Sequence, residues 1–396
     1  MTRQISDRQV GIMLAMSIVS LKLLILPALI SRYTIRYSYL TILCGFIIDF
    51  VFILISLKVL NKFPHLTFSE IIERSFGKVA RYFINLVLCA YFFFKGILII
   101  KETHNYFNET LFENMNWWFF VIPFLLLIFY VMIKDLKTIS RSVEFFFILI
   151  TAGVVLTILI PIKSVDFSNL LPLFGEGGGG LLKSLFYCNF SFGDYFVVIM
   201  VLGRVKVKPN SSKKIINYCL LFDFFVFMFY IVFVAMFGEI SVKQSLAISD
   251  LPLHSIAAST ISRLDWIVVI IWTITLVFQA AILFSLSCAS LTEAFCFKSK
   301  HIPALIIVAA TFVMIYHYYL NLEGILDLFI SLPFSVVSLV VQVAVPVILL
   351  IGYAKLSHTY RFNAFDVIKR AQIKIQYTDI SGAKVKKSRA NKTYYF

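Results

Sequence analysis

The segment Tyr187-Cys-Asn-Phe-Ser-Phe-Gly-Asp-Tyr195 puts an amide, a glycine and a carboxylate into a long apolar run at 184–203. The segment Ser17-Ile-Val-Ser-Leu-Lys-Leu-Leu-Ile-Leu-Pro27 similarly puts two hydroxyls, a lysine and a proline into the first apolar run. Glycine and proline disfavour a continuous helix, so each segment predicts a helix that is broken near its middle. An ordinary kink at Pro27 and a surface bend at Gly193 are the alternative that stays open.

The sequence around these two segments has the composition of a membrane protein. Of its 396 residues, 60% are hydrophobic and 14% are charged, whereas soluble domains carry about 25% charged residues. A membrane helix needs about 20 apolar residues, and about ten stretches qualify, which we number as spans 1 to 10. They run near 8–31, 37–59, 81–100, 117–133, 143–162, 184–203, 215–237, 264–297, 302–320 and 330–353. We expect an all-α integral membrane protein, since lipid leaves open backbone groups without partners.

The basic residues predict the orientation of these spans. Of the 36 Lys and Arg residues, 27 lie in one set of alternate loops and in the two terminal segments, whereas 6 lie in the other loops. An excess of Lys and Arg marks the cytoplasmic side, so both termini are expected in the cytoplasm. Topology thus accounts for the net charge of +15, and we expect no nucleic-acid partner. The predicted domains are a membrane domain at 1–353 and a basic cytoplasmic tail at 354–396.

One loop on the basic side predicts an additional short helix. The residues Thr67-Phe-Ser-Glu70 form a capping-box pattern, in which the first and fourth side chains bond each other's backbone N–H groups. We expect this helix to lie at the cytoplasmic membrane surface and to end at Gly77.

Five charged residues lie deep within the predicted spans, where each costs at least about 2.5 kcal/mol. We expect them to neutralise one another around an interior cavity. The alternative is a set of pairs that only hold the helices in register. The five are Lys22, Asp49, Lys95, Asp194 and Asp223.

Ten spans divide into two halves of five, at about 8–162 and 184–353, which makes span 6 the counterpart of span 1. Broken helices at corresponding positions predict a binding site for a small polar ligand. The candidate ligand-binding residues are Ser17, Ser20, Lys22, Lys95, Asn189, Ser191, Gly193 and Asp194. Asp49 and Asp223 then occupy loosely equivalent positions in spans 2 and 7, where we expect a proton-coupling or a structural charge.

Enzymatic motifs are missing from the sequence. It contains neither a G-x-S-x-G nor an H-E-x-x-H motif, and its six cysteines show no C-x-x-C spacing. The histidines show no metal-site spacing either. We therefore expect no enzyme, no catalytic residues, no metal and no other cofactor.

Several short segments resemble the B-subunit family of endospore germinant receptors, within the amino acid, polyamine and organocation permease superfamily. They are Ile5-Ser-Asp-Arg-Gln9, Leu26-Pro27, Phe76-Gly-Lys78, Lys101-Glu-Thr103, Arg141-Ser-Val-Glu144 and Val165-Asp-Phe-Ser-Asn-Leu-Leu-Pro-Leu173. The resemblance covers roughly residues 5–200. It implies a LeuT-like fold of two inverted five-helix repeats, with a ligand pocket at mid-membrane between spans 1, 3, 6 and 8.

The resemblance also implies partners and a location. Members of the family work in the inner membrane of bacterial spores, beside an A-type subunit and a lipoprotein C-type subunit, and are thought to recognise germinants such as amino acids. The chain departs from amino-acid permeases because the break in span 1 contains no glycine. Lys22 is therefore expected to supply positive charge, either to a ligand carboxylate or to Asp194, and Lys95 is the competing cation.

The sequence thus predicts a germinant-receptor subunit in a bacterial inner (cell or spore) membrane, which binds a small molecule and acts with partner subunits. A proton-coupled amino acid transporter is the main alternative, because a buried aspartate beside a lysine can couple proton movement to uptake. A channel is a third reading, although the chain shows no ring of repeated charges.

Overall fold

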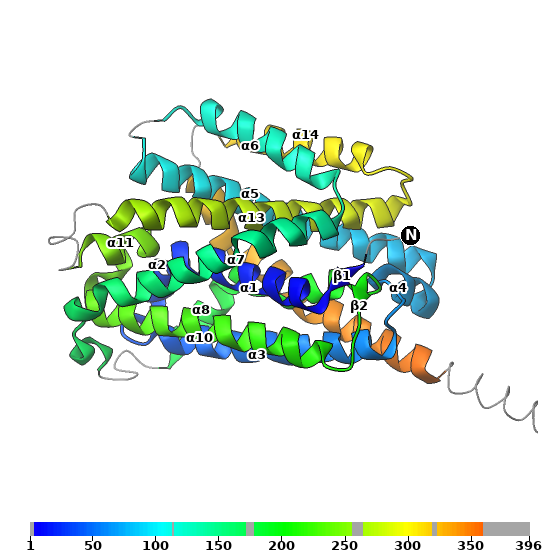
Figure 1. The fold of residues 1–396 in the computed structure, drawn as a ribbon, viewed down its shortest axis with the longest axis horizontal. Helices are drawn as coiled ribbons and strands as arrows, with labels where there is room; N and C mark the ends of the chain where they lie inside the picture. The colour runs from blue at the N-terminus through cyan, green and yellow to red at the C-terminus, as the bar shows by residue number, and fades with distance from the viewer. Residues whose placement is uncertain (1–3, 113–114, 172–177, 256–263, 319–322, 359–396) are drawn as a thin grey trace, which may run out of the picture.

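A computed structural model describes residues 4–112, 115–171, 178–255, 264–318 and 323–358. Within these ranges the chain is helical except for loops and one two-stranded sheet (Figure 1). All but the first residues of the predicted basic tail lie outside the described ranges.

Span 1 consists of two helices with a sharp bend between them. Helix α1 (Asp7–Leu24) begins with a capping box between Ser6 and Gln9, and α2 (Leu26–Thr34) follows after a single residue at an angle of 59°. Pro27 lies in the first turn of α2, where its ring and missing N–H interrupt the helix. The interruption predicted in span 1 is therefore present, as a bend at the proline without an unwound segment.

The other long helices are α3 (Ser38–Lys62), α5 (Lys78–Thr110), α7 (Leu136–Leu159), α10 (Ser211–Phe237), α13 (Leu264–Phe295) and a last helix at Leu332–His358. In the described residues, six helices are long and apolar enough to cross a membrane, and the bent α1–α2 pair makes up to seven. Helices α6 (Trp117–Met132) and α14 (His301–His317) are shorter but also apolar. The all-helical, membrane-type fold is confirmed, whereas the ten spans and the inverted repeat stay predictions.

Span 6 contains the second interruption. Helix α8 (Gly179–Tyr187) is followed by the short helix η3 (Asn189–Ser191), a non-helical segment at 192–194 and α9 (Tyr195–Met200). Gly193 has a φ of +90°, and a Cβ added there would lie 2.6 Å from the Tyr91 hydroxyl. The break predicted at Gly193 is confirmed, and it is buried in the protein rather than a surface bend.

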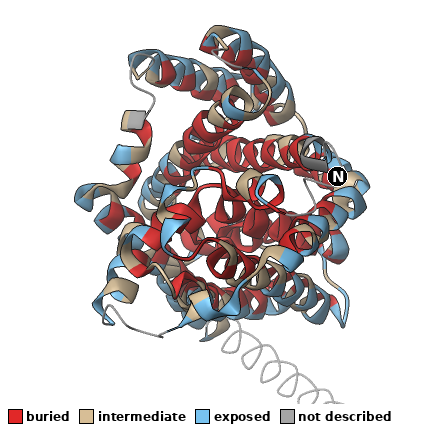
Figure 2. Cartoon of the chain, turned by 90° about the vertical axis from the view of Figure 1, so that its left-hand side faces the viewer, coloured by how far each residue is buried: buried red, intermediate tan, exposed pale blue. Residues whose placement is uncertain are grey.

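Helix α1 is the centre of the molecule. Nearly all of its residues are buried, and it packs against α7, α9, α10 and α13. The other main contact joins α5 and α13, and α6 with α14 forms an outer layer beside this pair (Figure 1). Figure 2 shows the buried residues concentrated around these central helices.

The end of the bundle near the N-terminus carries the small sheet and the predicted short helix. Strand β1 (Ile5–Ser6) pairs in parallel with β2 (Val205–Lys206). Helix α4 (Phe68–Phe76) has the capping box between Thr67 and Glu70 and ends at Gly77, so this helix prediction is confirmed.

Polar contacts bring several of the basic segments together at this end. Lys214 Nζ lies 3.4 Å from an Asp7 carboxylate oxygen, and Lys300 Nζ donates to the Lys134 carbonyl oxygen at 3.0 Å. Contacts and a shared cavity group the following elements at the opposite end: α2, η1 (Ile160–Ser164), η2 (Phe167–Leu170), η4 (Gly238–Lys243), α11 (Ala247–Leu253) and α15 (Glu323–Ile330). Which end faces the cytoplasm stays a prediction.

Candidate functional site

The non-helical segment Phe192–Asp194 exposes backbone groups that a helix would have paired internally. Asp49 of α3 accepts hydrogen bonds from the N–H groups of this segment. Both of its carboxylate oxygens accept the Gly193 N–H, at 3.0 and 3.1 Å, and one also accepts the Asp194 N–H at 3.4 Å. An unpaired N–H in a membrane costs several kcal/mol, so Asp49 stabilises the break.

Two side chains of α5 donate hydrogen bonds to the Phe192 carbonyl oxygen of the same segment. Lys95 Nζ donates to the Phe192 carbonyl oxygen at 2.7 Å, and the Tyr91 hydroxyl donates to that oxygen at 3.2 Å. Tyr91 and Lys95 also hydrogen-bond each other at 3.3 Å, since they lie four residues apart on one helix face. A cation and a hydroxyl thus hold the carbonyl that the break leaves open.

The Asp194 side chain points away from this backbone and pairs with α1. Lys22 forms a buried ion pair with one carboxylate oxygen, and the Ser17 hydroxyl donates to the other at 2.8 Å. The Tyr230 hydroxyl of α10 donates to the Lys22 carbonyl oxygen at 2.9 Å. The Lys22 ammonium also lies 5.5 Å from the centre of the Phe192 ring, where a cation–π contact is favourable.

We call Lys22, Asp49, Lys95 and Asp194 the central charge cluster. Each is 6% exposed or less, and together they carry two positive and two negative charges. Four of the five predicted intramembrane charges therefore meet at the break in span 6. Their formal charges balance, which lowers the cost of burying them.

Among the described residues, Asp223 makes no direct contact with the central charge cluster, although its charge interacts electrostatically with Lys22, Asp194 and Asp49. It is half-buried on α10, and its carboxylate accepts a hydrogen bond from the Cys219 thiol one turn earlier at 3.2 Å. No hydrogen bond or ion pair joins it to the four clustered charges in the described part of the chain. The proton-coupling or structural role expected for Asp223 and Asp49 stays a prediction.

Several buried polar atoms of α1, η3 and α13 have no hydrogen-bond partner among the described residues. They are the hydroxyls of Ser20, Ser191 and Ser285 and the side-chain oxygens of Asn189 and Gln279. Ser20 lies on α1, Asn189 and Ser191 on η3, and the other two on α13. Buried polar groups normally have partners, so this unused capacity fits a small polar ligand or ordered water. Three of the five were predicted ligand-binding residues.

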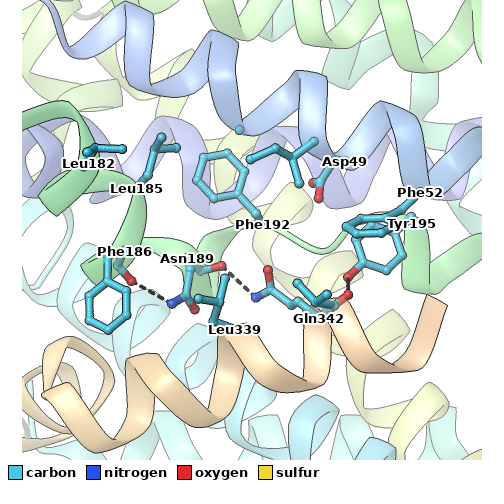
Figure 3. A pocket seen from close by; sticks show the side chains of 13 residues that line it. Asp49, Phe52, Leu182, Leu185, Phe186, Asn189, Phe192, Tyr195, Leu339 and Gln342 are labelled. Carbon is cyan, nitrogen blue, oxygen red and sulfur yellow. Dashed lines mark hydrogen bonds between the residues drawn. The ribbon is translucent and has the colours of Figure 1, made fainter. Parts of the chain in front are cut away.

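A cavity of about 210 Å³ lies beside the break, between α3, α8 and the last helix (Figure 3). Asp49, Asn189 and Gln342 supply its polar lining, and the other lining residues are mostly apolar or aromatic. Gln342 Nε2 donates to the Asn189 carbonyl oxygen at 2.8 Å, and the Tyr195 hydroxyl donates to the Gln342 carbonyl oxygen. This cavity lies between spans 2, 6 and 10, whereas the pocket between spans 1, 3, 6 and 8 stays a prediction.

Two residues of the site, Tyr91 and Gln342, are not among those predicted from the sequence. Gln342 is a lone amide within the apolar span 10, which is a usable signal. Tyr91 carries no charge, and only its position one turn before Lys95 on the same helix face points to it. Within the described ranges, no group of three His, Cys, Asp or Glu side chains could hold a metal ion.

Comparison with known proteins agrees with the resemblance seen in the sequence. Spore germination protein GerQB of Bacillus cereus is 23% identical over 281 residues, which are 71% of this chain and 77% of that protein. Spore germination protein YndE of Bacillus subtilis (strain 168) is 24% identical over 217 residues, or 54% of this chain and 60% of that protein. Spore germination protein A2 of the same strain is 25% identical over 172 residues, or 43% and 47%.

The profile of a protein family described as "Spore germination protein" matches nearly the whole chain, at residues 4–356. This family of spore permeases is not an enzyme family, and the predicted resemblance to germinant-receptor B subunits is confirmed. The chain belongs to the Spore germination protein family of membrane permeases.

Proposed function

We propose that this chain is the membrane-embedded subunit of a germinant receptor, which binds a small molecule such as an amino acid and triggers spore germination with partner subunits. The observation that carries the proposal is the central charge cluster around the break at Phe192–Asp194. A transmembrane helix interrupted beside buried charges is the arrangement that binds small polar ligands in permeases.

The balanced charges favour a zwitterion over an ion of one sign. A ligand carboxylate takes the place of Asp194 beside Lys22, and the ligand ammonium takes the place of Lys22 beside Asp194. The buried site then stays electrically neutral, whereas an anion or a cation alone adds an uncompensated charge. The unpartnered hydroxyls of Ser20 on α1 and Ser191 on η3 can complete the ligand's hydrogen bonds.

Ligand binding in this arrangement acts directly on α1. The Lys22–Asp194 pair joins α1 to the break, and α1 also packs against α7, α10 and α13. A ligand that separates the pair favours a different position of α1, so binding energy shifts the balance between two arrangements of the bundle. Signalling through A-type and C-type partner subunits, from an inner membrane with both termini in the cytoplasm, is part of the same proposal.

The test measures the melting temperature of the purified chain in lipid nanodiscs, with each standard amino acid in turn. At least one amino acid should raise the melting temperature of the wild type and of Asp223→Asn, which removes an intramembrane aspartate outside the cluster. Asp194→Asn should reduce the rise, because it removes one of the proposed ligand contacts. No rise with any amino acid, or an equal rise in Asp194→Asn, contradicts the proposal.

A second measurement separates receptor from transporter. The stabilising amino acid is tested for counterflow into proteoliposomes that contain this chain alone. Binding without counterflow supports a receptor subunit whose output requires partners. Counterflow that Asp194→Asn abolishes assigns the site to a secondary transporter and overturns the receptor proposal.

A further inference from the structure

A second polar cavity lies at the end of the bundle opposite the small sheet. Its volume is about 310 Å³, and α2, the last turns of α5, η4 and α15 form its walls. We call it the outer cavity. Ile25, the single residue between α1 and α2, is part of its lining, so the cavity reaches the bend in span 1.

The outer cavity carries equal numbers of positive and negative charges. They belong to Arg32, Lys101 and Lys243 and to Glu102, Glu109 and Asp327. Lys101 and Glu102 pair with each other at 2.7 Å, and their side chains are 4% and 2% exposed. This pair is a buried part of the cavity wall. Its two charges neutralise each other, so neither is available to a ligand.

Three other charged groups of the outer cavity are available to a ligand. In the described parts of the chain, no hydrogen bond or ion pair ties the side chains of Arg32, Lys243 or Asp327. They come from three different elements, α2, η4 and α15, so their charges surround the cavity rather than one helix. Glu109 accepts one hydrogen bond, from Ser245 at 3.0 Å, and its carboxylate keeps further acceptor capacity.

We propose that the outer cavity is a second binding site, for a small zwitterion such as a neutral α-amino acid. The ligand carboxylate binds Arg32 and Lys243, and its ammonium group binds Asp327 and Glu109. A single-sign ion is repelled by half of these groups, whereas a zwitterion pairs with both halves. Binding in the outer cavity does not depend on the central charge cluster. A role of the outer cavity in delivering ligand to that cluster rests on the proposed function.

The test labels a thiol placed in the outer cavity of the full chain in nanodiscs. Ser245 is exposed and lines the cavity, so Ser245→Cys reacts there with a hydrophilic maleimide. The chain without this substitution measures the reaction of the native cysteines, of which Cys296 is exposed near the opposite end. The probe is alanine, with propionate and ethylamine as compounds of similar size that carry one charge each.

Alanine is expected to slow the labelling in a saturable manner, and neither single-charge compound should do so. Arg32→Gln and Asp327→Asn should each raise the alanine concentration for half-protection about tenfold, the factor for one lost hydrogen bond to a charged group. Lys163→Gln removes an exposed lysine of η1 at the same end, outside the cavity, and should change nothing. No protection by alanine, equal protection by propionate or ethylamine, or unchanged protection in Arg32→Gln and Asp327→Asn overturns the outer site.

The substitution Asp194→Asn, added to Ser245→Cys, separates this proposal from the central site. Protection that persists in Asp194→Asn, with an unchanged rise in melting temperature, supports the outer site and contradicts the proposed central site. A rise in melting temperature that requires Asp194, without any protection at position 245, supports the central site and overturns the outer one.

Discussion

Asp49 accepts the Gly193 N–H through both of its carboxylate oxygens, at 3.0 and 3.1 Å. A charged side chain of one helix therefore replaces the backbone hydrogen bond that another helix loses at its break. The contact explains why a costly buried carboxylate lies at this depth. It also links span 2 to the segment that carries Asp194.

The first prediction concerns this contact. Asp49→Ala leaves the Gly193 N–H buried without an acceptor, which costs about 1–3 kcal/mol. Asp49→Asn keeps one acceptor oxygen at the same place and should lose less. Melting temperatures of the purified variants in nanodiscs report the difference, with Asp223→Asn as the control outside the cluster. Equal stability of Asp49→Ala and the wild type contradicts the assigned role.

The second prediction separates backbone strain from packing at Gly193. Gly193 and Gly77 have nearly the same φ, +90° and +93°, but an added Cβ lies 2.6 Å from Tyr91 at Gly193 and meets nothing within 4 Å at Gly77. Gly77→Ala should cost about 1–3 kcal/mol through strain alone. Gly193→Ala should cost more, and Tyr91→Phe should restore part of that excess. Equal losses of stability in Gly77→Ala and Gly193→Ala would show that contact with Tyr91 adds no cost at Gly193.

The third prediction is a double-mutant cycle on Lys22 and Asp194. Removal of either member leaves a buried charge unpaired, which costs about 3–5 kcal/mol. The double variant Lys22→Ala, Asp194→Ala removes both charges and should be more stable than Asp194→Ala with Lys22 intact. Urea or thermal denaturation in mild detergent supplies the four free energies of unfolding. Additive losses would mean that the two side chains do not interact.

Much of this site follows from the sequence, because intramembrane charges and helix breakers are conspicuous among apolar residues. Lys22, Asp49, Lys95 and Asp194 were identified in this way, and Pro27 and Gly193 mark the two interruptions. The pairing was less predictable: hydropathy gives the depth of a residue but not the direction of its side chain. Asp223 illustrates the limit, since it has a similar depth to Asp49 but forms no hydrogen bond or ion pair with the cluster in the described residues.

The fourth prediction concerns the end of the bundle that carries the small sheet and α4. Glu293 of α13 pairs with Arg204 and also accepts a hydrogen bond from Ser69 of α4, so it joins three segments. Glu293→Ala should speed hydrogen exchange of the α4 and β2 amides, because both segments lose a connection to α13. Glu73→Ala removes a different ion pair at this end, with Arg81 at 2.6 Å, and should leave β2 unchanged. Unchanged exchange in Glu293→Ala contradicts this role of Glu293.

The fifth prediction concerns pH and the segment α11, outside the membrane-spanning helices. Burial raises the pKa of Asp250 from 3.8 to about 6, although its carboxylate accepts the Leu246 N–H at 3.1 Å. Because the folded protein holds this proton more tightly than the unfolded chain, the contribution to stability is full below pH 4 and is lost as pH rises through 6. Asp250→Asn should therefore flatten the fall in melting temperature between pH 4 and 7. An unchanged slope of melting temperature against pH in Asp250→Asn contradicts the raised pKa of Asp250.

The most direct test of the central claim is a binding titration with the labelled amino acid that stabilises the wild type. The double variant Lys22→Ala, Asp194→Ala keeps the formal charge of the site neutral but removes both proposed ligand contacts, and Asp223→Asn is the matched control. All proteins in this titration also carry Arg32→Gln and Asp327→Asn, which weaken binding in the outer cavity. In this background we expect saturable binding to the protein with an intact central charge cluster and to Asp223→Asn, and none to the folded double variant. Undiminished binding to the double variant would place the ligand elsewhere and contradict the account.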